Sequence, residues 1–237
     1  MIIPVIEFKN KEIRFIPKEE GFVKSGYEIN SSKNYETLQK ILKIHGKKYN
    51  SYVTIATYNG IPNFPLELKS HMKEFKEWVQ INDETIKSMD FFIDLDATPT
   101  ISGLKKAWVD VVRAKYMLHL LLGDQAKYLT TWFSGNKGFH ILGKCKNITI
   151  AQENIDKQHK IAEQLKTLCP TIDTSIYDTK RIRKLLGSYV YSTNFGRTRV
   201  IPVQDEQQFK ELIKAIKTKN EQWFQEKPLV QLNNINI

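Results

Sequence analysis

The sequence predicts a mixed α/β fold built as one unit. Segments rich in β-branched and aromatic residues alternate along the chain with segments whose apolar residues recur every three or four positions. Of the 237 residues, 41% are hydrophobic and 26% are charged, which is the balance of a globular protein with a sizeable core. No internal repeat or low-complexity linker divides the sequence into separate domains.

The first part of the chain is predicted to contain strands and helices around a polar loop. Strands are expected where apolar and polar residues alternate or β-branched residues gather, and helices where apolar residues follow helical spacing. The predicted strands are 2–8, 12–16 and 52–58, with a hairpin turn at 9–11. The predicted helices are 38–45 and 68–79, and 21–32 is expected to be a loop.

A buried strand over 89–98 is predicted to lead into a long helix. Ser102 can cap this helix, which is expected to run to about Leu122, and Gly123 is well suited to end it. The apolar stripe that the helix turns towards the core is predicted to comprise Trp108, Val111, Val112, Tyr116 and Leu120.

The rest of the chain continues the alternation of strands and helices. Strands at 128–133 and 139–142 are expected to form a hairpin around a turn at 134–138. A capping box of Thr149 and Gln152 predicts a helix that runs to about Leu168, before Pro170. The segments 181–190 and 198–203 are expected to be extended. The last helix is marked by Phe209, Leu212, Ile213 and Ile216, and the Asn-rich tail after Pro228 is expected to be loose.

Charge and cysteine content narrow the classes of function. The chain carries 36 basic and 26 acidic residues, and the net charge of +10 favours a polyanionic partner, nucleic acid ahead of a membrane surface. A plain solubility charge is the alternative. The apolar runs are too short to span a bilayer, and no signal-peptide pattern is present. Cys145 and Cys169 are too few for a four-cysteine zinc site, so both are expected to be core thiols in a reducing cytoplasm.

The centre of the predicted site is a pair of acids at the end of the 89–98 strand. Side chains alternate along a strand, so Asp94 and Asp96 point the same way, on the face of Phe92. Neighbouring carboxylates raise each other's pKa unless a cation lies between them, and Mg²⁺ or Mn²⁺ suits oxygen ligands. Such a pair is half of the usual scaffold for two-metal nucleotidyl transfer, whereas chance capping of a strand is the alternative. The opposite face of the strand is expected to carry Met89, Phe91, Ile93 and Leu95.

A second motif lies in the turn between the two hairpin strands. Ser134, Gly135, Lys137 and Gly138 can present N–H groups, a hydroxyl and a cation to phosphate oxygens, and His140 follows just inside the next strand. The glycine spacing differs from that of a Walker A loop. An ordinary tight hairpin with an exposed lysine is the alternative interpretation.

A third motif supplies another acid and a basic cluster. Asp173 follows an apolar residue as Asp94 does, and Arg181, Arg183 and Lys184 are candidates to hold phosphates. The alternative is a solvated basic turn in which Asp173 or Asp178 forms local ion pairs. Asp173 is preferred to Asp178 as a third metal ligand because it directly follows Ile172 at the predicted strand.

Together these motifs resemble those of the archaeo-eukaryotic primase superfamily, which comprises catalytic primases and primase-polymerases. In order, the chain has apolar-Asp-apolar-Asp at 93–96, Ser-Gly-x-x-Gly-x-His at 134–140, apolar-Asp at 172–173 and Arg-x-Arg-x-Leu-x-Gly-Ser at 181–188. The resemblance covers about half of the chain, from 89 to 188. Each motif is common alone, whereas the order and spacing of the four are specific.

The resemblance implies roles for the motif residues. In that family the three acids bind two Mg²⁺ or Mn²⁺ ions, which maps to Asp94, Asp96 and Asp173. The histidine motif holds the triphosphate of the incoming nucleotide, and the later basic residues contact nucleotide phosphates or template. The implied nucleotide-binding residues are Ser134, Lys137, Gly138, His140, Arg181, Arg183 and Lys184.

The resemblance also implies how the chain is divided. One primase-polymerase domain would span 1–220, with an RRM-like catalytic half at about 86–203 packed on an N-terminal α/β half at about 1–85. A C-terminal helix would occupy about 204–220, followed by a tail at 221–237.

The implied activity is a DNA primase or primase-polymerase, a nucleotidyltransferase of DNA replication. It would make or extend primers from NTPs or dNTPs on single-stranded DNA. Many cellular subunits of the family have a zinc knuckle that two cysteines cannot build, so no zinc is expected, and a separate helicase or accessory primase subunit is an expected partner. We expect no membrane partner and a cytoplasmic, nucleoid-associated location, or a host cytoplasm for a plasmid or viral protein. Tyr58, Tyr189 and Tyr191 are candidates to stack on template bases, with core packing as the alternative.

Two other functions remain open on the sequence alone. The segment 92–98 also resembles the Asp-x-Asp-Gly-Thr nucleophile motif of haloacid-dehalogenase-type phosphatases, although Ala97 replaces the glycine and the 134–140 turn would have no role. A non-catalytic nucleic-acid-binding module would explain the basic charge. It would not explain three acids, because carboxylates without a metal weaken binding to DNA.

Overall fold

A computed structural model describes residues 11–18, 24–27, 48–59, 73, 77, 86–145, 151–178, 181–228, 232 and 234–235. The strand predicted at 2–8 and the helix predicted at 38–45 lie outside the described residues. So does most of the helix predicted at 68–79, of which Lys73 and Glu77 are described and are helical.

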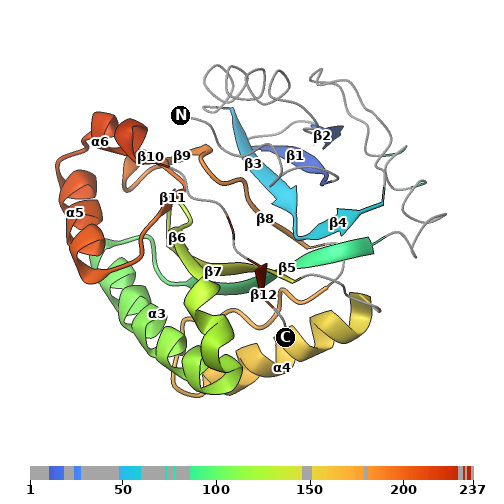
Figure 1. The fold of residues 1–237 in the computed structure, drawn as a ribbon. Helices are drawn as coiled ribbons and strands as arrows, with labels where there is room; N and C mark the ends of the chain where they lie inside the picture. The colour runs from blue at the N-terminus through green and yellow to red at the C-terminus, as the bar shows by residue number, and fades with distance from the viewer. Residues whose placement is uncertain are drawn as a thin grey trace.

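The largest sheet has six strands (Figure 1), and its longest strand carries Asp94 and Asp96. Its order is β11-β6-β7-β5-β4, and β12 lies beside β7. Neighbouring strands are antiparallel except for the parallel pair of β7 and β12. The strands are β4 (Ala56–Tyr58), β5 (Ile86–Asp96), β6 (Thr130–Phe133), β7 (Gly138–Cys145), β11 (Ile201–Pro202) and β12 (Asn234–Ile235).

A second, antiparallel sheet has the order β2-β1-β3-β8. Its strands are β1 (Ile13–Pro17), β2 (Lys24–Tyr27), β3 (Tyr49–Thr54) and β8 (Ile182–Lys184). The loop predicted at 21–32 is therefore wrong for 24–27, because the backbone of this polar segment completes the edge of β1. The segment predicted to be extended at 181–190 contains β8 and the start of β9 (Tyr189–Ser192). The segment predicted at 198–203 contains the end of β10 (Gly196–Arg199) and β11. Strands β9 and β10 form a separate hairpin.

The two sheets exchange strands at Ile55. The single strand predicted at 52–58 is divided there, so that β3 joins the four-stranded sheet and β4 joins the six-stranded sheet. The backbone N–H of Ile55 donates to Arg181 O at 3.0 Å, and its carbonyl accepts from Asp90 N at 2.9 Å. Conversely, β8 comes from the second half of the chain and pairs with β3 of the first half. The division into halves at about residue 85 stays a prediction, and strands cross it in both directions.

Helices cover the face of the six-stranded sheet that is turned away from the four-stranded sheet (Figure 1). The long predicted helix is α3 (Ile101–Leu122). Its N-cap is Thr100 and not Ser102 as predicted, and the Thr100 hydroxyl accepts a hydrogen bond from Gly103 N at 3.0 Å. It ends at Gly123 as predicted and continues into a short 3₁₀ helix, η3 (Gly123–Tyr128). The other helices are α4 (Ala151–Lys166), α5 (Glu206–Lys217) and α6 (Glu221–Glu226).

The predicted apolar stripe of α3 is correct on one side and wrong on the other. Trp108 and Val111 are buried, as predicted. Val112, Tyr116 and Leu120 are 53%, 67% and 67% exposed. Successive residues differ by about 100° around a helix, so a stripe centred on Val111 leaves these three turned outwards. The core face is completed by small and aliphatic residues, namely Leu104, Ala107, Ala114 and Leu118.

The alternation of β5 separates two cores. As predicted, Phe91, Ile93 and Leu95 share one face of the strand and Phe92 lies on the other. The first three pack towards α3 and α5, and Phe92 packs towards the four-stranded sheet. Met89 is the exception, because it packs in the second cluster beside the irregular pairing with β4. Both cysteine thiols are buried, which confirms the prediction of core thiols.

The C-terminal segment contains regular structure that the sequence did not predict. Helix α6 follows α5, and β12 pairs with β7 at Lys144 and Cys145, while Leu232 is 3% exposed. The prediction of a loose tail after Pro228 is therefore wrong for the described residues. No helix in the described part of the chain has the length and hydropathy needed to cross a membrane.

Candidate metal and nucleotide site

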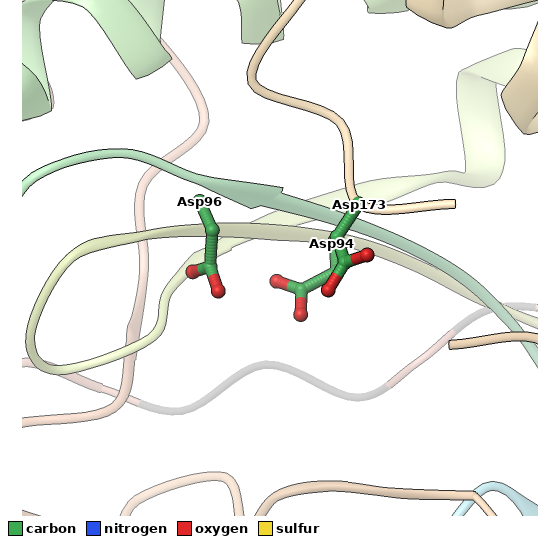
Figure 2. A group of neighbouring side chains, drawn as sticks. All are labelled: Asp94, Asp96 and Asp173. Atoms are coloured by element: carbon green, nitrogen blue, oxygen red, sulfur yellow. The ribbon is translucent and has the colours of Figure 1, made fainter. Parts of the chain in front are cut away.

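Three carboxylates meet at the end of β5. Asp94 and Asp96 point the same way from the strand, and Asp173 reaches the same point from a neighbouring segment (Figure 2). One carboxylate oxygen from each of the three lies within 4.8 Å of the others. Asp178, the alternative third ligand, is exposed and lies outside this group.

Backbone pairing places Asp173 beside the strand. The segment 171–173 lies along the edge of β5, where Asp96 N donates to Thr171 O at 2.7 Å and Asp173 N donates to Asp94 O at 2.9 Å. A bridge between Leu95 and Ile172 lies between these hydrogen bonds. The third acid is therefore held by the same strand that carries the first two.

Helix α3 fixes this segment from behind. Asp110 is buried, and its Oδ2 accepts from Thr171 N at 3.0 Å and from Thr171 Oγ1 at 2.8 Å. Lys166, at the end of α4, donates to Ile172 O at 2.7 Å. Two helices thus fix the backbone from which Asp173 projects.

Asp94 is the carboxylate for which ionisation is most unfavourable. Burial raises its pKa well above the usual range, and the charges of Asp96 and Asp173 raise it further. Its Oδ1 atom is buried and has no hydrogen-bond partner among the described residues. A hard divalent cation would satisfy that oxygen and relieve the repulsion, so the three residues suit Mg²⁺ or Mn²⁺.

Asp173 is better stabilised as an anion. Partial burial acts to raise its pKa, but Ser175 donates to its Oδ1 from N at 2.9 Å and from Oγ at 2.7 Å. Together with the charges of Arg181 and Lys166, these hydrogen bonds bring the pKa of Asp173 below the ordinary value. Asp173 therefore presents a charged carboxylate to the group.

Lys137 brings a cation to the acids from the turn between β6 and β7. Its Nζ lies 2.6 Å from Asp96 Oδ2, and its side chain is 49% exposed. The hydrogen bond with Asp96 and the charge of the three acids raise the pKa of Lys137. Its exposed ammonium can move towards a bound phosphate, which makes it available to a ligand in the pocket.

His140 faces Asp94 from the neighbouring strand. The two residues are paired in register between β5 and β7, and His140 Nε2 lies 3.4 Å from Asp94 Oδ1. Burial lowers the pKa of His140 to about 3, helped by the charges of Arg183 and Lys184, so the imidazole is neutral. Its Nδ1 is buried without a hydrogen-bond partner among the described residues, and Phe92 packs edge-on against the ring at 5.0 Å. A neutral imidazole can donate one hydrogen bond without adding charge.

The turn that carries Lys137 is fixed to β5 by its backbone. Ala97 N donates to Lys137 O at 3.0 Å, and Ser134 N donates to Gly138 O at 2.9 Å. A side chain at Gly138 would collide with the carbonyl of Leu95, so glycine is needed where β7 begins beside the acids. Gly138 is therefore a packing residue in this structure, whereas Ser134 lines the pocket.

One pocket joins the three predicted motifs. Its volume is about 350 Å³, and it lies where β5 and β7 face β3, β8 and β9. Among the predicted nucleotide-binding residues, Ser134, Lys137, His140, Arg181, Arg183 and Lys184 all line it, together with Asp94 and Asp96. Gly138 does not line it.

Arg183 has a structural partner that the sequence did not reveal. It is 1% exposed, and its Nε and Nη2 each lie 2.8 Å from Asp90 Oδ2. Lys11 lies 3.1 Å from the other oxygen of Asp90. These charges outweigh the effect of burial and lower the pKa of Asp90. Arg183 reaches the pocket wall, but its guanidinium is held by this buried cluster.

Sequence reasoning missed the pocket residues contributed by β3. Asn50 and Tyr52 line the pocket, and Lys184 Nζ donates to Tyr52 Oη at 2.9 Å. Burial, with the charge of Lys18, lowers the pKa of Lys184 to about 8. No local pattern marks Tyr52, because only the pairing of Tyr52 with Lys184 across two distant strands brings it to the site.

The three tyrosines suggested as base platforms have different surroundings. Tyr58 is 2% exposed, which rules out stacking on a template base. Tyr191 lines the pocket, and Lys18 lies over its ring at 4.4 Å. Arg197 lies 4.1 Å from the centre of the Tyr189 ring. The β9–β10 hairpin therefore carries two partly exposed aromatic rings beside cations at one edge of the site.

Comparison with known proteins finds similarity in structure and none in sequence. No known family model matches the sequence, and no curated protein is detectably similar to it. The polymerase domain of Ligase D from Mycobacterium tuberculosis, solved in complex with DNA, is 13% identical, with a TM-score of 0.51 over 94% of this chain and 88% of that chain.

Two further solved structures are similar at lower scores. The archaeo-eukaryotic primase domain of the primase-polymerase of cyanophage S-2L is 13% identical, with a TM-score of 0.43 over 86% of this chain and 89% of that chain. The catalytic domain of the primase RepB′, in complex with initiator DNA, is 9% identical, with a TM-score of 0.44 over 92% and 90%. The likeness to the Ligase D polymerase domain concerns the fold, and the mixed α/β fold expected from the sequence is confirmed.

Proposed function

We propose that this protein is a nucleotidyltransferase that adds nucleotides to a primer on a single-stranded DNA template, or begins such a primer. The observation that carries the proposal is a pocket that two of the three grouped acids, Asp94 and Asp96, line together with residues of a glycine-containing turn and a basic wall. On a primase fold, these are the parts that binding and transfer of a nucleoside triphosphate require.

The acids supply the metal site of the proposed reaction. Asp94, Asp96 and Asp173 would hold two Mg²⁺ or Mn²⁺ ions, and the buried, unpartnered oxygen of Asp94 is the strongest argument for a cation there. When bound, such ions lower the pKa of an attacking 3′-hydroxyl and stabilise the departing pyrophosphate. The carboxylates fix where that chemistry takes place, at the end of a buried strand.

The remaining pocket residues would bind the triphosphate. Lys137 and Lys184 offer ammonium groups, and Ser134 offers a hydroxyl. Neutral His140 can donate a hydrogen bond to a phosphate oxygen without competing with the metals for Asp94. Arg183 contributes positive potential from behind the wall, because its guanidinium is held by Asp90.

A DNA template is the partner that the charge favours. The net charge of +10 attracts a polyanion, and Tyr189 and Tyr191 with their cations are suited to stacking and phosphate contact beside the pocket. A helicase or accessory primase subunit remains an expected further partner.

The two alternatives fit the site less well. A phosphatase of the haloacid-dehalogenase type gives no role to the 134–140 turn, whereas Ser134, Lys137 and His140 line the same pocket as the acids. A non-catalytic binding module has no use for a group of three acids at a basic pocket that two of them line, because carboxylates repel DNA unless a metal neutralises them.

Primer synthesis on single-stranded DNA tests the proposal. The assay compares Mg²⁺ with Mn²⁺, NTPs with dNTPs, and templates with and without a primer, and Asp96→Asn is the inactive control. Product without a primer identifies a primase, and product only with a primer identifies a polymerase of the same fold. No product together with hydrolysis of a generic phosphate ester supports the phosphatase. No product, with DNA binding that needs no metal, supports the binding module.

A further inference from the structure

In the described part of the chain, most of the exposed large apolar side chains lie on one helix, α3. Among the described residues, the exposed large hydrophobic side chains lie on α3, at Tyr128 just after it, and at Leu168 beside it. Val109, Val112, Tyr116 and Leu120 are between 48% and 67% exposed. Their spacing of three and four residues places them on one face, which we call the outer stripe.

The outer stripe is hard to explain for a protein without a partner. The opposite face of α3 is already buried in the core, so α3 carries one apolar stripe that faces the core and a second that faces outwards, whereas a surface helix normally has a polar outer face. Single exposed hydrophobic residues are ordinary, but a continuous apolar surface marks an interaction site. Exposure of this apolar stripe to water is unfavourable in free energy, and a bound partner would remove that exposure.

A groove runs beside the outer stripe. Its volume is about 620 Å³, and it lies between α3 and the end of α4. Leu168, which is 57% exposed, and Thr167 form the α4 side, and Tyr116 and Val112 form the α3 side. A concave apolar groove along a helix accepts the side chains of a second helix, whereas a flat surface such as a bilayer leaves it unfilled.

The charge around the groove decides what kind of helix fits. The exposed charged residues of α3 are basic, namely Lys105, Lys106 and Arg113. Lys115 is half-buried, and its Nζ donates to Gln204 O at 3.2 Å. The single acid of α3, Asp110, is buried, where it accepts from Thr171 and lies 3.5 Å from Arg113 Nη1. On α4, Glu163 lies 3.6 Å from His159, and none of the described acids lines the groove. The apolar stripe therefore has a basic border.

We propose that the groove of α3 and α4 binds an amphipathic helix of another protein, with an apolar stripe flanked by acidic residues. A second copy of this chain would bring two basic borders and two charges of +10 together, which opposes self-association. The stripe from Val109 to Leu120 covers about three turns, or ~16 Å, so about twelve residues of the partner helix are in contact.

This surface is separate from the site of the proposed reaction. The side chains of β5 that face α3 are Phe91, Ile93 and Leu95, whereas the acids point from the other face of that strand. A partner on α3 therefore leaves the nucleotide pocket open. The inference does not depend on the proposed enzyme activity.

A designed peptide tests the proposal with the full chain. The probe is a fluorescent amphipathic peptide of about 18 residues, with leucine on one face and glutamate on the other, and its matched counterpart carries lysine in place of glutamate. Fluorescence anisotropy measures the binding of each peptide. The glutamate peptide is expected to bind at least about tenfold more tightly than the lysine peptide.

Variants identify the surface that the peptide occupies. Tyr116→Ser with Leu120→Ser is expected to weaken binding about tenfold. Leu121→Ser with Tyr128→Ser changes the same residue types at partly exposed positions away from the stripe and is expected to leave binding unchanged. Lys106→Glu is expected to weaken binding, and Lys217→Glu on α5, with the same change in net charge, is the control. Circular dichroism checks that each variant is folded.

Four outcomes would overturn the proposal. The first is no preference for the glutamate peptide, and the second is binding that the Tyr116→Ser and Leu120→Ser changes leave intact. The third is a dimer in analytical ultracentrifugation that those changes dissociate, which assigns the groove to a second copy. The fourth is sedimentation with phosphatidylglycerol vesicles that those changes abolish while peptide binding persists, which assigns the stripe to a membrane.

Discussion

Asp90 and Asp94 lie four residues apart on the same strand and have opposite surroundings. Asp90 is 1% exposed and touches Lys11 and Arg183, so its charge is compensated inside the protein. Asp94 is 14% exposed, and its neighbours are two further acids and a neutral histidine. The pKa of Asp90 is lowered, and the pKa of Asp94 is raised well above its usual value.

The contrast distinguishes a structural acid from a functional one. Ionisation of either carboxylate is opposed by the loss of hydration, and the charged form is stable there only where a counter-charge is present. For Asp90 the counter-charges belong to the chain itself. For Asp94 the chain supplies none in direct contact, which is the arrangement expected where the missing cation is a ligand.

The largest expected effect is on catalysis. Asp94→Asn keeps the shape of the side chain but removes the charge that holds the metals, so nucleotide addition is expected to fall by at least about a thousandfold. Primer extension with Mn²⁺ measures the loss. Urea unfolding in EDTA should find the variant at least as stable as wild type, and wild-type synthesis by this variant would contradict the metal assignment.

The matching change at Asp90 is expected to act on stability instead. Asp90→Asn leaves Lys11 and Arg183 buried without their counter-ion, and breaking such a buried cluster typically costs about 3–5 kcal/mol of unfolding free energy. Urea unfolding in EDTA measures it, with Asp94→Asn as the control on the same strand. Equal stability of the two variants would remove the distinction between the acids.

A change of pH should alter the stability contributions of Asp90 and Asp94 in opposite directions. The folded pKa of Asp94 lies above its unfolded value of 3.8, so its contribution to stability is present below pH 3.8 and is lost as pH rises through the folded pKa. The folded pKa of Asp90 is lowered, so its contribution is present above pH 3.8 and is lost as pH falls through the folded pKa.

Urea unfolding without metal from pH 3 to neutrality tests this difference. Asp94→Asn should gain stability relative to wild type as pH rises, by at most about 1.4 kcal/mol per pH unit, and the deficit of Asp90→Asn should shrink as pH falls. Mn²⁺ added at neutral pH should raise the unfolding free energy of the wild type and have little effect on that of Asp94→Asn. Parallel pH profiles for wild type and both variants would contradict the electrostatic comparison.

The smallest expected effect concerns His140, which touches Asp94 without compensating its charge. His140→Ala is expected to weaken nucleotide binding about tenfold, the value of one hydrogen bond to a charged group, while metal binding is kept. Titration with a fluorescent nucleotide in Ca²⁺ measures the affinity. Unchanged affinity in that titration would remove His140 from the nucleotide site.

Much of the site could be predicted because its residues lie in local motifs. Asp94 and Asp96 follow from strand alternation, which fixes their direction without knowledge of the fold. Asp173 needed the family resemblance, since nothing in the sequence shows that 171–173 pairs with β5. Tyr52 and Asp90 had no local signal at all, because their partners lie on strands that are distant in the chain.

The fold was predictable to a similar limit. The periodicity of α3 gave its length but not the face that turns inwards, because apolar residues occur all round the helix. The short polar strand β2 and the pair of β12 with β7 are made by backbone hydrogen bonds to neighbours, which composition does not encode. Ile55, where β3 ends and β4 begins, carries no turn residue to mark the change of sheet.

The exchange of strands at Ile55 has a consequence for how the molecule forms. Tyr52 and Lys184 are 132 positions apart and meet only when β8 reaches β3, after both sheets have begun to assemble. Pairings between such distant residues close long loops and slow folding. Neither half can be cut out as an autonomous piece, since each sheet would lack a strand held by the other. The pocket across that exchange is therefore expected to be among the last parts to form during folding and to be absent from any stable fragment.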